Sequence, residues 1–125
     1  MKRMISVLLA LLLLAGCGGG EETAPYRQIS QEEAKEMMDA QEVIILDVRE
    51  QDEYDSGHIP GAVLLPVGTI DEDTAATVIP AKDATVLVYC RSGNRSKTAS
   101  SALAELGYTN IYEFGGIKTW PYETE

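Results

Sequence analysis

Residues 85–99 read TVLVYCRSGNRSKTA, and the rest of the chain can be understood as the support for this stretch. Thr85 to Tyr89 is a β-branched, apolar run of the kind that forms a strand buried on both faces of a sheet. After Cys90 the sequence becomes polar and contains Gly93, and Ser96 then opens a helical pattern. The helix is predicted over 97–106, with apolar residues along one side at Ala99, Ala102, Leu103 and Leu106. The stretch therefore predicts a strand, a tight loop and a helix in direct succession.

The predicted loop is suited to holding a negatively charged sulfur atom. The amides of a tight loop and the first N–H groups of a helix point inward, and Gly93 can adopt the positive φ that closes them into an anion-binding nest. A free cysteine titrates near ~8.5, and such surroundings can lower this pKa to roughly 3.5–7.5. The helix terminus alone contributes about 0.3–1 kcal/mol, whereas one pKa unit requires about 1.4 kcal/mol. Loop amides and nearby cations must supply the remainder, and Cys90 is the candidate catalytic residue.

The charges of the predicted loop are opposite in sign to those of the whole chain. Between Ala84 and Ala104 the charged residues are Arg91, Arg95 and Lys97, without an acid among them, in a chain of net charge −10. We expect Arg91 and Arg95 to attract and orient an anionic ligand, and Arg95, near the start of the helix, to stabilise a thiolate. An Arg91 side chain that points into solvent would act only by long-range, salt-sensitive attraction. The candidate binding residues of the loop are Arg91, Ser92, Gly93, Asn94, Arg95 and Ser96.

Three further motifs surround this loop in a definite order. They are DVRE at 47–50, GHIPGA at 57–62 and a late GGI-x-x-W pattern at 115–120, with Tyr54 between the first two. Together with the loop, they make residues 29–120 resemble the single-domain rhodanese family. The resemblance implies an α/β domain with a central parallel sheet of about five strands, helices on both faces, and a persulfide-forming cysteine at Cys90.

The resemblance also implies a sulfurtransferase that works without a cofactor. In such an enzyme Cys90 would take the outer sulfur of a small anionic donor such as thiosulfate, become a persulfide, and pass the sulfur to an acceptor. Cyanide is the family's assay acceptor, and a small thiol or a protein thiol is the acceptor that we expect in a cell envelope. No metal site is predicted, because the sequence contains no cluster with metal-ligand spacing.

Two other functions are compatible with the loop. A cysteine phosphatase also uses a cysteine-to-arginine loop over a helix N-terminus, but related phosphatases have one residue more than the four that separate Cys90 from Arg95. The shorter ring fits a sulfur atom better than a tetrahedral phosphate. A noncatalytic rhodanese-like module that carries sulfur or binds a partner would retain the same cysteine. Sulfur transfer through Cys90 is the predicted function, with these two as alternatives.

Polar residues outside the loop are predicted to have supporting roles. Asp47 and Arg49 lie at the end of a predicted buried strand over 43–48, at the edge where parallel sheets gather functional residues. The resemblance implies that they form a structural ionic and hydrogen-bonded pair, and direct contact with substrate is the alternative. His58 is the only histidine, and because it lies in a turn-rich segment we predict a structural role rather than that of a general base. Trp120 is similarly expected to pack within the fold rather than stack on a substrate.

The first residues have the pattern of a lipoprotein leader. Two cations precede a short apolar run over 5–14, and residues 14–17, LAGC, resemble a bacterial lipobox. An ordinary secretory signal that is cut elsewhere is the alternative. A lipidated protein would be anchored to the membrane of the cell envelope on the extracytoplasmic side. We predict a signal peptide at 1–16, a lipidated tether at 17–25 that begins at Cys17, and a rhodanese-like domain at 26–125.

Length, charge and cysteine content limit the remaining possibilities. The chain has 125 residues, which after removal of the leader suits one domain. A net charge of −10 argues against binding to nucleic acid, because such binding requires a basic face. The two cysteines, Cys17 and Cys90, lie in such different contexts that a disulfide between them is not expected. No feature of the sequence predicts an oligomeric state.

Two further helices are predicted from capping residues. Ser30 and Glu33 form a capping box before a helix over 31–40, and Thr69 is the expected N-cap of a helix that ends at Pro80. The residues of this second helix that are expected to face inward are Ala75, Ala76 and Ile79.

Apolar runs and turn residues predict the remaining elements. Strands are expected at 25–29, 62–65 and 110–114, and a short helix at 50–55. Gly115 and Gly116 are expected to let the backbone pass close to the rim of the Cys90 site.

Overall fold

The computed structural model describes residues 25–125. The predicted signal peptide at 1–16, the predicted lipidation site Cys17 and the predicted tether up to residue 24 lie outside the described residues. Within 25–125, no helix combines the length and the apolar character needed to cross a membrane.

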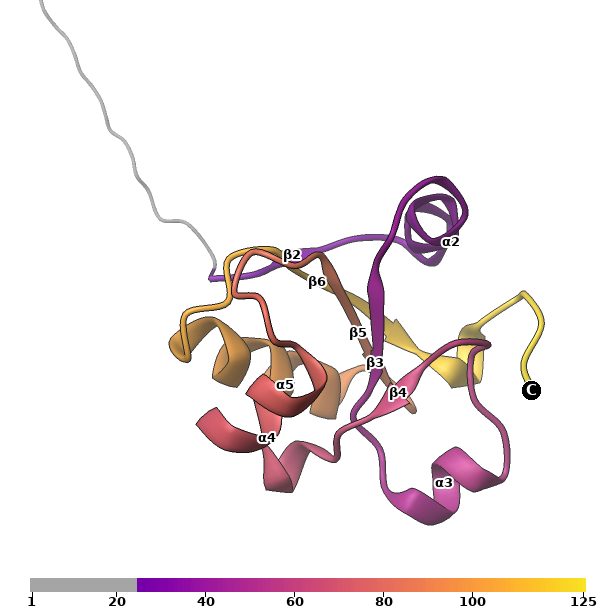
Figure 1. Ribbon diagram of the computed structural model, residues 1–125. Coiled ribbons are helices and arrows are strands. Elements are labelled where there is room, and N and C mark those ends of the chain that lie inside the picture. Colours follow the sequence, from indigo (N-terminus) through magenta and orange to yellow (C-terminus); the bar gives the residue numbers. More distant parts are fainter. Residues whose placement is uncertain (1–24) are drawn as a thin grey trace, which may run out of the picture.

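Five parallel strands form one central sheet, as predicted (Figure 1). In spatial order they are β2 (Arg27–Gln28), β6 (Ile111–Gly116), β5 (Val86–Cys90), β3 (Ile44–Asp47) and β4 (Val63–Leu64). The central strand β5 is buried along its whole length, because both faces of the sheet are covered. Since the strands are parallel, β5 ends at the same edge of the sheet as its neighbours β3 and β6.

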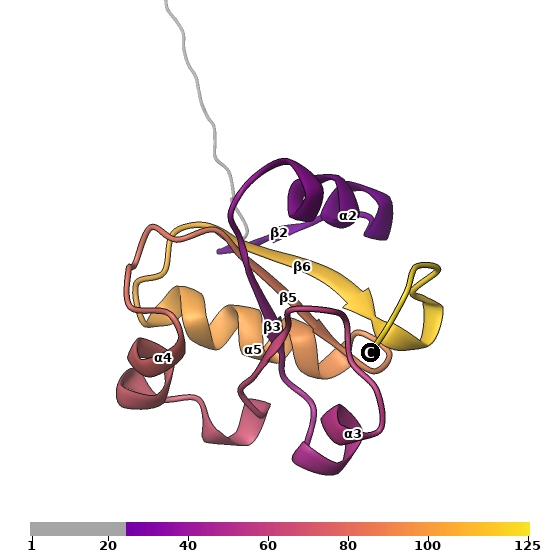
Figure 2. The same ribbon diagram turned by 45° about the vertical axis from the view of Figure 1, so that its right-hand side comes forward.

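Helices cover both faces of the sheet (Figures 1 and 2). One face carries α2 (Gln31–Ala40), which begins at the predicted capping box of Ser30 and Glu33. The other face carries α4 (Glu72–Val78) and α5 (Asn94–Glu105). The remaining elements of the described part of the chain are α3 (Gln51–Asp55), which follows β3, and two single-turn 3₁₀ segments, η1 (Val67–Thr69) and η2 (Ile117–Thr119). The predicted α/β architecture with helices on both faces is therefore confirmed.

The alternation of side chains along β5 divides the core into two halves. Val88 and Cys90 pack on the α5 side of the sheet with Leu103. The intervening Tyr89 packs on the α2 side with Phe114. Because successive residues of a strand face opposite sides of the sheet, this register turns the Cys90 side chain toward α5.

Two helix starts differ from the sequence prediction. α5 begins at Asn94 rather than after Ser96, because Gly93 occupies the cap position with φ = +109°. α4 is capped by Asp71, whose side chain accepts a hydrogen bond from a backbone N–H of the first turn. The prediction of Thr69 as N-cap was wrong, since Thr69 belongs to η1. Asp71 directly precedes the first helical residue, so its carboxylate can accept a hydrogen bond from the first turn, whereas Thr69 lies too far upstream to do so.

The buried face of α4 is narrower than predicted. Ala75 and Ile79 are fully buried, as expected, but Ala76 is exposed. Adjacent helical residues are separated by about 100° around the helix axis, so Ala76 points away from the sheet when Ala75 points toward it.

Candidate active site

Cys90 lies at the carboxyl end of β5, where the chain turns into α5 through Arg91, Ser92 and Gly93. Its side chain is 1% exposed, so the sulfur lies at the floor of the loop rather than on the surface. Within residues 25–125 it is a free cysteine. Parallel sheets gather their functional groups at this edge, so the fold places Cys90 where the sequence predicted it.

Hydrogen-bond donors surround the Cys90 sulfur. The Gly93 N–H donates to Sγ at 3.0 Å, and the Ser96 hydroxyl oxygen lies 3.4 Å from Sγ. Burial raises the pKa of the Cys90 thiol, but hydrogen bonds from the Ser96 hydroxyl and from the N–H groups of Ser96, Gly93 and Ser92 outweigh it. The net result is a pKa below the usual value for cysteine. The loop amides therefore point inward, in the arrangement that the sequence predicted for an anion-binding nest.

The other predicted loop residues divide into an inner and an outer set. Ser96 is fully buried beside the sulfur, together with Gly93. Arg91, Ser92 and Asn94 are exposed, so only the backbone of this part of the loop faces Cys90. Because the Arg91 side chain is exposed, we expect it to attract anions over a long range rather than to support the sulfur directly.

The end of β6 holds the loop in place through a close approach of two backbones. A Cβ built on Gly116 would clash with the Arg91 carbonyl group and would lie 2.5 Å from the Ser92 nitrogen. The N–H of Lys118, in η2, donates to the same Arg91 carbonyl at 3.1 Å. Gly115 has φ = +91°, a conformation that other residues rarely adopt. The expectation that this glycine pair passes close to the Cys90 site is confirmed.

Gly116→Ala is expected to displace the loop and slow the alkylation of Cys90. The added methyl group would collide with backbone atoms that cannot rotate away, and such overpacking costs about 1–3 kcal/mol. Alkylation rates and urea denaturation curves would measure both effects. Gly68→Ala is the matched control, since a Cβ at that position meets no atom of residues 25–125 within 4 Å. Equal alkylation rates in the two variants would contradict this role of Gly116.

Arg95 is paired with an acid that the sequence reasoning missed. Its guanidinium donates to both carboxylate oxygens of Glu53, on α3, at 2.8 and 2.9 Å. This hydrogen bonding lowers the pKa of Glu53 to about 2, so the pair stabilises the folded protein fully above pH 4.5, and this stabilisation is lost as the pH falls through the folded-state pKa. The pair partly neutralises the charge that was expected to stabilise the Cys90 thiolate. The direct donors to the sulfur are instead the loop amides and Ser96.

A second acid, Glu113 of β6, also lies at the site and was not singled out from the sequence. It is 3% exposed, and its Oε2 accepts hydrogen bonds from the Ser96 hydroxyl at 2.5 Å and from the Gly115 N–H at 2.9 Å. A charged residue that alternates with apolar residues in a predicted strand is the signal that could have identified it, because charged groups are rarely buried without partners.

Asp47 and Arg49 form a buried network with Tyr89. Arg49 donates from Nε and Nη2 to the Asp47 carboxylate at 2.9 and 2.7 Å, and the Tyr89 hydroxyl donates to Asp47 at 2.6 Å. Arg49 Nη2 also donates to the Gly57 carbonyl at 2.7 Å. The network joins the ends of β3 and β5 to the turn that precedes β4. Because these groups already have protein partners, the geometry favours a structural role over direct contact with substrate.

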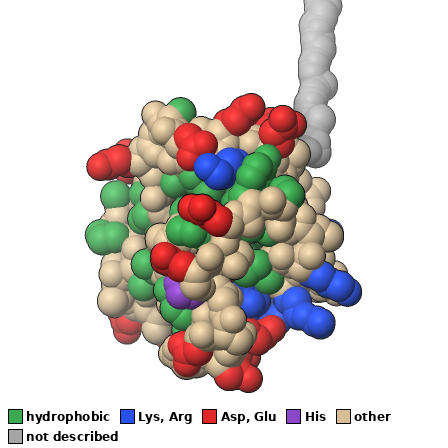
Figure 3. Space-filling view, turned by 90° about the vertical axis from the view of Figure 1, so that its right-hand side faces the viewer, with side chains coloured by type: hydrophobic (Ala, Val, Ile, Leu, Met, Phe, Trp, Pro, Cys, Tyr) green, Lys and Arg blue, Asp and Glu red, His purple; other side chains and the backbone are tan. Residues whose placement is uncertain are grey.

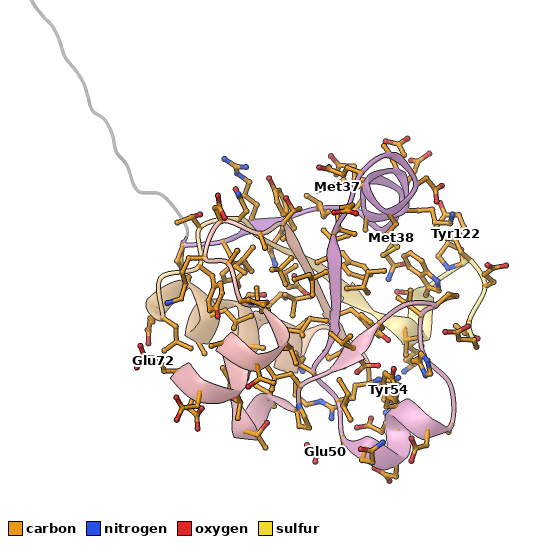
Figure 4. All side chains as sticks on the ribbon, viewed as in Figure 1. Met37, Met38, Glu50, Tyr54, Glu72 and Tyr122 are labelled. Atoms are coloured by element: carbon orange, nitrogen blue, oxygen red, sulfur yellow. The ribbon has the colours of Figure 1, made fainter. Side chains whose placement is uncertain are left out.

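His58 and Trp120 pack within the fold. His58 Nδ1 lies 3.0 Å from the Tyr54 carbonyl oxygen, and the two rings stack with centroids 3.9 Å apart. Tyr54 projects from α3 toward β4 (Figure 4), and its hydroxyl donates to the Ala62 carbonyl at 2.6 Å. The Trp120 ring packs against Phe114, with ring centroids 5.6 Å apart. These contacts agree with the structural roles expected for both residues.

Comparison with known families gives two matches. Residues 30–122 match the family described as rhodanese-like domain. Residues 1–17 match the family of prokaryotic membrane lipoprotein lipid attachment sites. The first match covers most of the chain and includes both the Cys90 loop and the glycine pair that supports it.

Individual relatives of this chain are also rhodaneses or thiosulfate sulfurtransferases. The thiosulfate sulfurtransferase GlpE of Coxiella burnetii is 36% identical over 96 residues, which cover 76% of this chain and 87% of that protein. The thiosulfate sulfurtransferase PspE of Escherichia coli is 40% identical over 73 residues, which cover 58% of this chain and 69% of that protein. A solved structure described as rhodanese with anions from E. coli has a TM-score of 0.62 and 33% identity, covering 67% of this chain and 98% of the other. The chain therefore belongs to the rhodanese-like domain family, as a sulfurtransferase of the rhodanese type.

Proposed function

We propose that this sulfurtransferase moves a sulfane sulfur from a small anionic donor such as thiosulfate to a thiophilic acceptor, through a persulfide on Cys90. The observation that carries the proposal is the set of donors around the Cys90 sulfur, which are the Ser96 hydroxyl and the N–H groups of Ser96, Gly93 and Ser92; together they lower the pKa of the Cys90 thiol against the effect of burial. A thiolate is the nucleophilic form of cysteine, so these donors favour the reactive state. The relatives named thiosulfate sulfurtransferase support thiosulfate as the donor to test first.

The first half-reaction is a displacement at sulfur. The Cys90 thiolate attacks the outer sulfur of thiosulfate, a new S–S bond forms, and the original S–S bond breaks with its electron pair leaving on sulfite. The product is a Cys90 persulfide whose terminal sulfur carries the negative charge. The loop amides that hold the thiolate would hold this anion as well, because they are already oriented before the reaction.

The second half-reaction returns the enzyme to its starting state. The thiolate of a small thiol or of another protein, or cyanide in an assay, attacks the terminal sulfur of the persulfide. The S–S bond to Cys90 breaks, and the electron pair returns to the Cys90 sulfur as a thiolate. No cofactor is needed for either step, since each is the displacement of one nucleophile by another at a sulfane sulfur atom.

Arg95→Ala is expected to weaken donor binding about two- to fivefold, seen as a higher KM for thiosulfate with a smaller change in kcat. The substitution removes a partly exposed cation and leaves the Glu53 carboxylate unpaired near an anionic substrate. Arg27→Ala is the control, because Arg27 contacts Tyr112 and lies on the edge strand β2. An unchanged KM for Arg95→Ala would remove Arg95 from the set of binding residues.

Two alternative functions make different predictions for the same sample. A cysteine phosphatase would hydrolyse a phosphate ester and would not gain sulfur from thiosulfate. A noncatalytic carrier would accept sulfur on Cys90 from a protein donor but would turn over thiosulfate poorly. The tight loop between Cys90 and Arg95, with its N–H groups converging on a single sulfur atom, favours sulfur transfer over phosphate chemistry.

Intact-mass measurement of the protein after incubation with thiosulfate tests the proposal. We expect a gain of one sulfur atom on Cys90 and the release of one equivalent of sulfite. Addition of a small thiol should remove the added sulfur. A protein whose mass stays unchanged in thiosulfate would contradict the proposed donor, and sulfur found only at another residue would contradict the role of Cys90.

We propose that the protein acts at the membrane of the cell envelope, on the extracytoplasmic side, through a lipid on Cys17. The match of residues 1–17 to a lipid attachment site supports this assignment. Cys17→Ser is expected to move the protein from the membrane fraction to the aqueous fraction while leaving sulfur transfer per molecule unchanged. Retention of this variant in the membrane fraction would contradict anchoring through Cys17.

Acidic side chains are distributed over the face shown in Figure 3, where Lys and Arg side chains are fewer and gather in small groups. Anionic donors would therefore be attracted locally rather than by the protein as a whole. Because the net charge is −10, activity toward a small anion should depend on the few cations of the loop region.

A further inference from the structure

Glu113 is a buried carboxylate that the proposed sulfur transfer does not yet use. It lies on β6 and is 3% exposed. Its Oε2 is 2.5 Å from the Ser96 hydroxyl oxygen and 2.9 Å from the Gly115 nitrogen, and its Oε1 accepts from the Gln28 amide at 3.3 Å. Ser96 in turn lies 3.4 Å from the Cys90 sulfur. The hydroxyl of Ser96 therefore connects the nucleophile to a buried base.

The Ser96 hydroxyl has one proton, and this limits which contacts can exist at the same time. When Cys90 is a thiol, its S–H can donate to the Ser96 oxygen while the Ser96 O–H donates to the Glu113 carboxylate. When Cys90 is a thiolate, the Ser96 O–H is needed as a donor to sulfur, and Glu113 can keep its short contact only by donating a proton to the Ser96 oxygen. The protonation states of Cys90 and Glu113 are therefore coupled through the single hydroxyl group of Ser96.

We propose that Cys90, Ser96 and Glu113 form a proton relay that generates the thiolate before sulfur transfer. The inference rests on the proposed function of Cys90 and deepens it. The thiol proton moves to the Ser96 oxygen as the Ser96 proton moves to Glu113 Oε2, leaving a thiolate, a neutral serine and a carboxylic acid. The Cys90 S–H bond and the original Ser96 O–H bond break, and a new O–H bond forms on Ser96 and another on Glu113, without any external base. Glu113 acts through Ser96 and is thus a positioning residue that also stores the proton.

The backbone is shaped to bring Glu113 to this position. Val88 of β5 pairs with Glu113, but Cys90, two residues later, pairs with Gly116, three residues later. The extra residue forms a β-bulge in β6, which re-aims side chains next to it. Gly115 allows the bulge with φ = +91°, and its N–H donates to the Glu113 carboxylate. Strand alternation already places Glu113 on the α5 side of the sheet with Val88 and Ile111, and the bulge after it brings the Gly115 N–H onto its carboxylate.

A hollow of about 330 Å³ gives Glu113 a route for proton exchange with solvent. Its lining includes Glu113, Gln28, Ser92 and Lys97. Of the described side chains that line it, Lys97 from α5 is the one cation, whereas β2 and α2 contribute neutral Gln28 and Gln31. Arg95 from the same helix is held by Glu53. A proton taken up by Glu113 can therefore leave by this hollow after the persulfide has formed.

The pH dependence of Cys90 alkylation tests the relay. Coupled groups that share a proton titrate in two macroscopic steps, whereas an isolated thiol titrates in one. Using the full chain, with labelling of Cys90 by iodoacetamide followed by peptide mass, we expect two steps for the wild-type protein. Glu113→Gln should give a single step, because glutamine fills the same space but cannot take up the proton.

Two serine variants separate the relay from general effects on helix α5. Ser96→Ala should also give a single step, with its midpoint raised by about one pH unit, since a hydrogen bond to the thiolate is lost. Ser100→Ala is the matched control, because Ser100 lies on the same helix and its buried hydroxyl has no hydrogen-bond partner among the described residues. The control should keep the two-step profile of the wild-type protein.

A single step in the wild-type protein, or identical profiles for the wild-type protein and Glu113→Gln, would overturn the relay. If Glu113→Gln does not fold, the carboxyl carbon signal of Glu113 in the wild-type protein provides the second measurement. As the pH is raised, the chemical shift of this carbon should change over the same pH range as the ultraviolet absorbance of the Cys90 thiolate. In Cys90→Ser the step at the higher pH should be absent. A Glu113 signal that titrates identically in Cys90→Ser would also overturn the relay.

Failure of the relay can be distinguished from failure of the proposed function. Persulfide formation from thiosulfate in the wild-type protein is measured on the same preparation by intact mass. If the persulfide forms but the pH profiles of Cys90 alkylation show no coupling to Glu113, the proposed sulfur transfer stands and only the relay through Ser96 and Glu113 is refuted. Absence of the persulfide would remove the sulfur transfer on which the relay depends.

Discussion

Cys90→Ser is expected to abolish the gain of sulfur from thiosulfate and to reduce sulfur transfer by about a thousandfold or more. The serine hydroxyl keeps the size and position of the side chain, but it is not ionised at neutral pH and is a far weaker nucleophile toward sulfur. The loop amides would then have no anion to stabilise. Intact mass after incubation with thiosulfate, together with sulfite release, measures the loss directly.

The fold of Cys90→Ser should be nearly intact, because the substitution changes one atom of a residue that is 1% exposed, and this atom already faces hydrogen-bond donors. Its denaturation midpoint should lie close to that of Ser100→Ala, a conservative change on the neighbouring helix. Sulfur transfer retained in a folded Cys90→Ser protein would show that another group is the nucleophile.

Asp47→Asn is expected to cause the largest loss of stability among conservative substitutions, about 3–5 kcal/mol. Asp47 is fully buried and accepts hydrogen bonds from Arg49 and from the Tyr89 hydroxyl. Burial and Asp47 together raise the pKa of Tyr89, so Tyr89 remains a neutral donor. Removal of the carboxylate charge would leave the Arg49 guanidinium, which is 5% exposed, as an uncompensated buried cation.

Such a loss is a large part of the roughly 5–15 kcal/mol that stabilises a domain, so Asp47→Asn should unfold at clearly lower urea concentration. Asp83→Asn is the matched control, since Asp83 is exposed and a surface substitution changes stability by about 0.5 kcal/mol or less. If the two variants unfold at the same urea concentration, the Asp47–Arg49 network contributes little to stability.

The sequence predicted those features that depend on local chemistry. The buried strand at Val86–Cys90, the tight turn at Gly93 and the capping box at Ser30 each arise from residues close together in the chain. Backbone propensity and alternation of apolar residues determine them before tertiary contacts form. The fold class and the position of Cys90 followed from this local information and from the resemblance to rhodaneses.

Features that depend on distant residues were not predicted. Glu53 lies 42 residues before Arg95, and Glu113 lies 17 residues after Ser96. The local sequence around Cys90 contains three cations and no acid, which suggested that the loop was uniformly basic. Folding brings one acid to Arg95 and another to Ser96, so the electrostatics of the site is more balanced than the linear sequence implies. The spacing of residues along the sequence does not predict these contacts, because they form only when α3, α5 and β6 pack together.

The parallel arrangement of the outermost strand β2 has a consequence for access to the enzyme. Arg27 pairs with Tyr112, and Val86 pairs with Ile111, so the described chain enters the fold level with the start of β5, whereas Cys90 lies at its end. The four residue steps from Val86 to Cys90 separate these two edges by about 13 Å. A segment attached upstream of Pro25 therefore joins the domain at the edge of the sheet opposite to the one that holds Cys90. Donors and acceptor thiols that approach the Cys90 edge would then not meet the point at which the chain enters the domain.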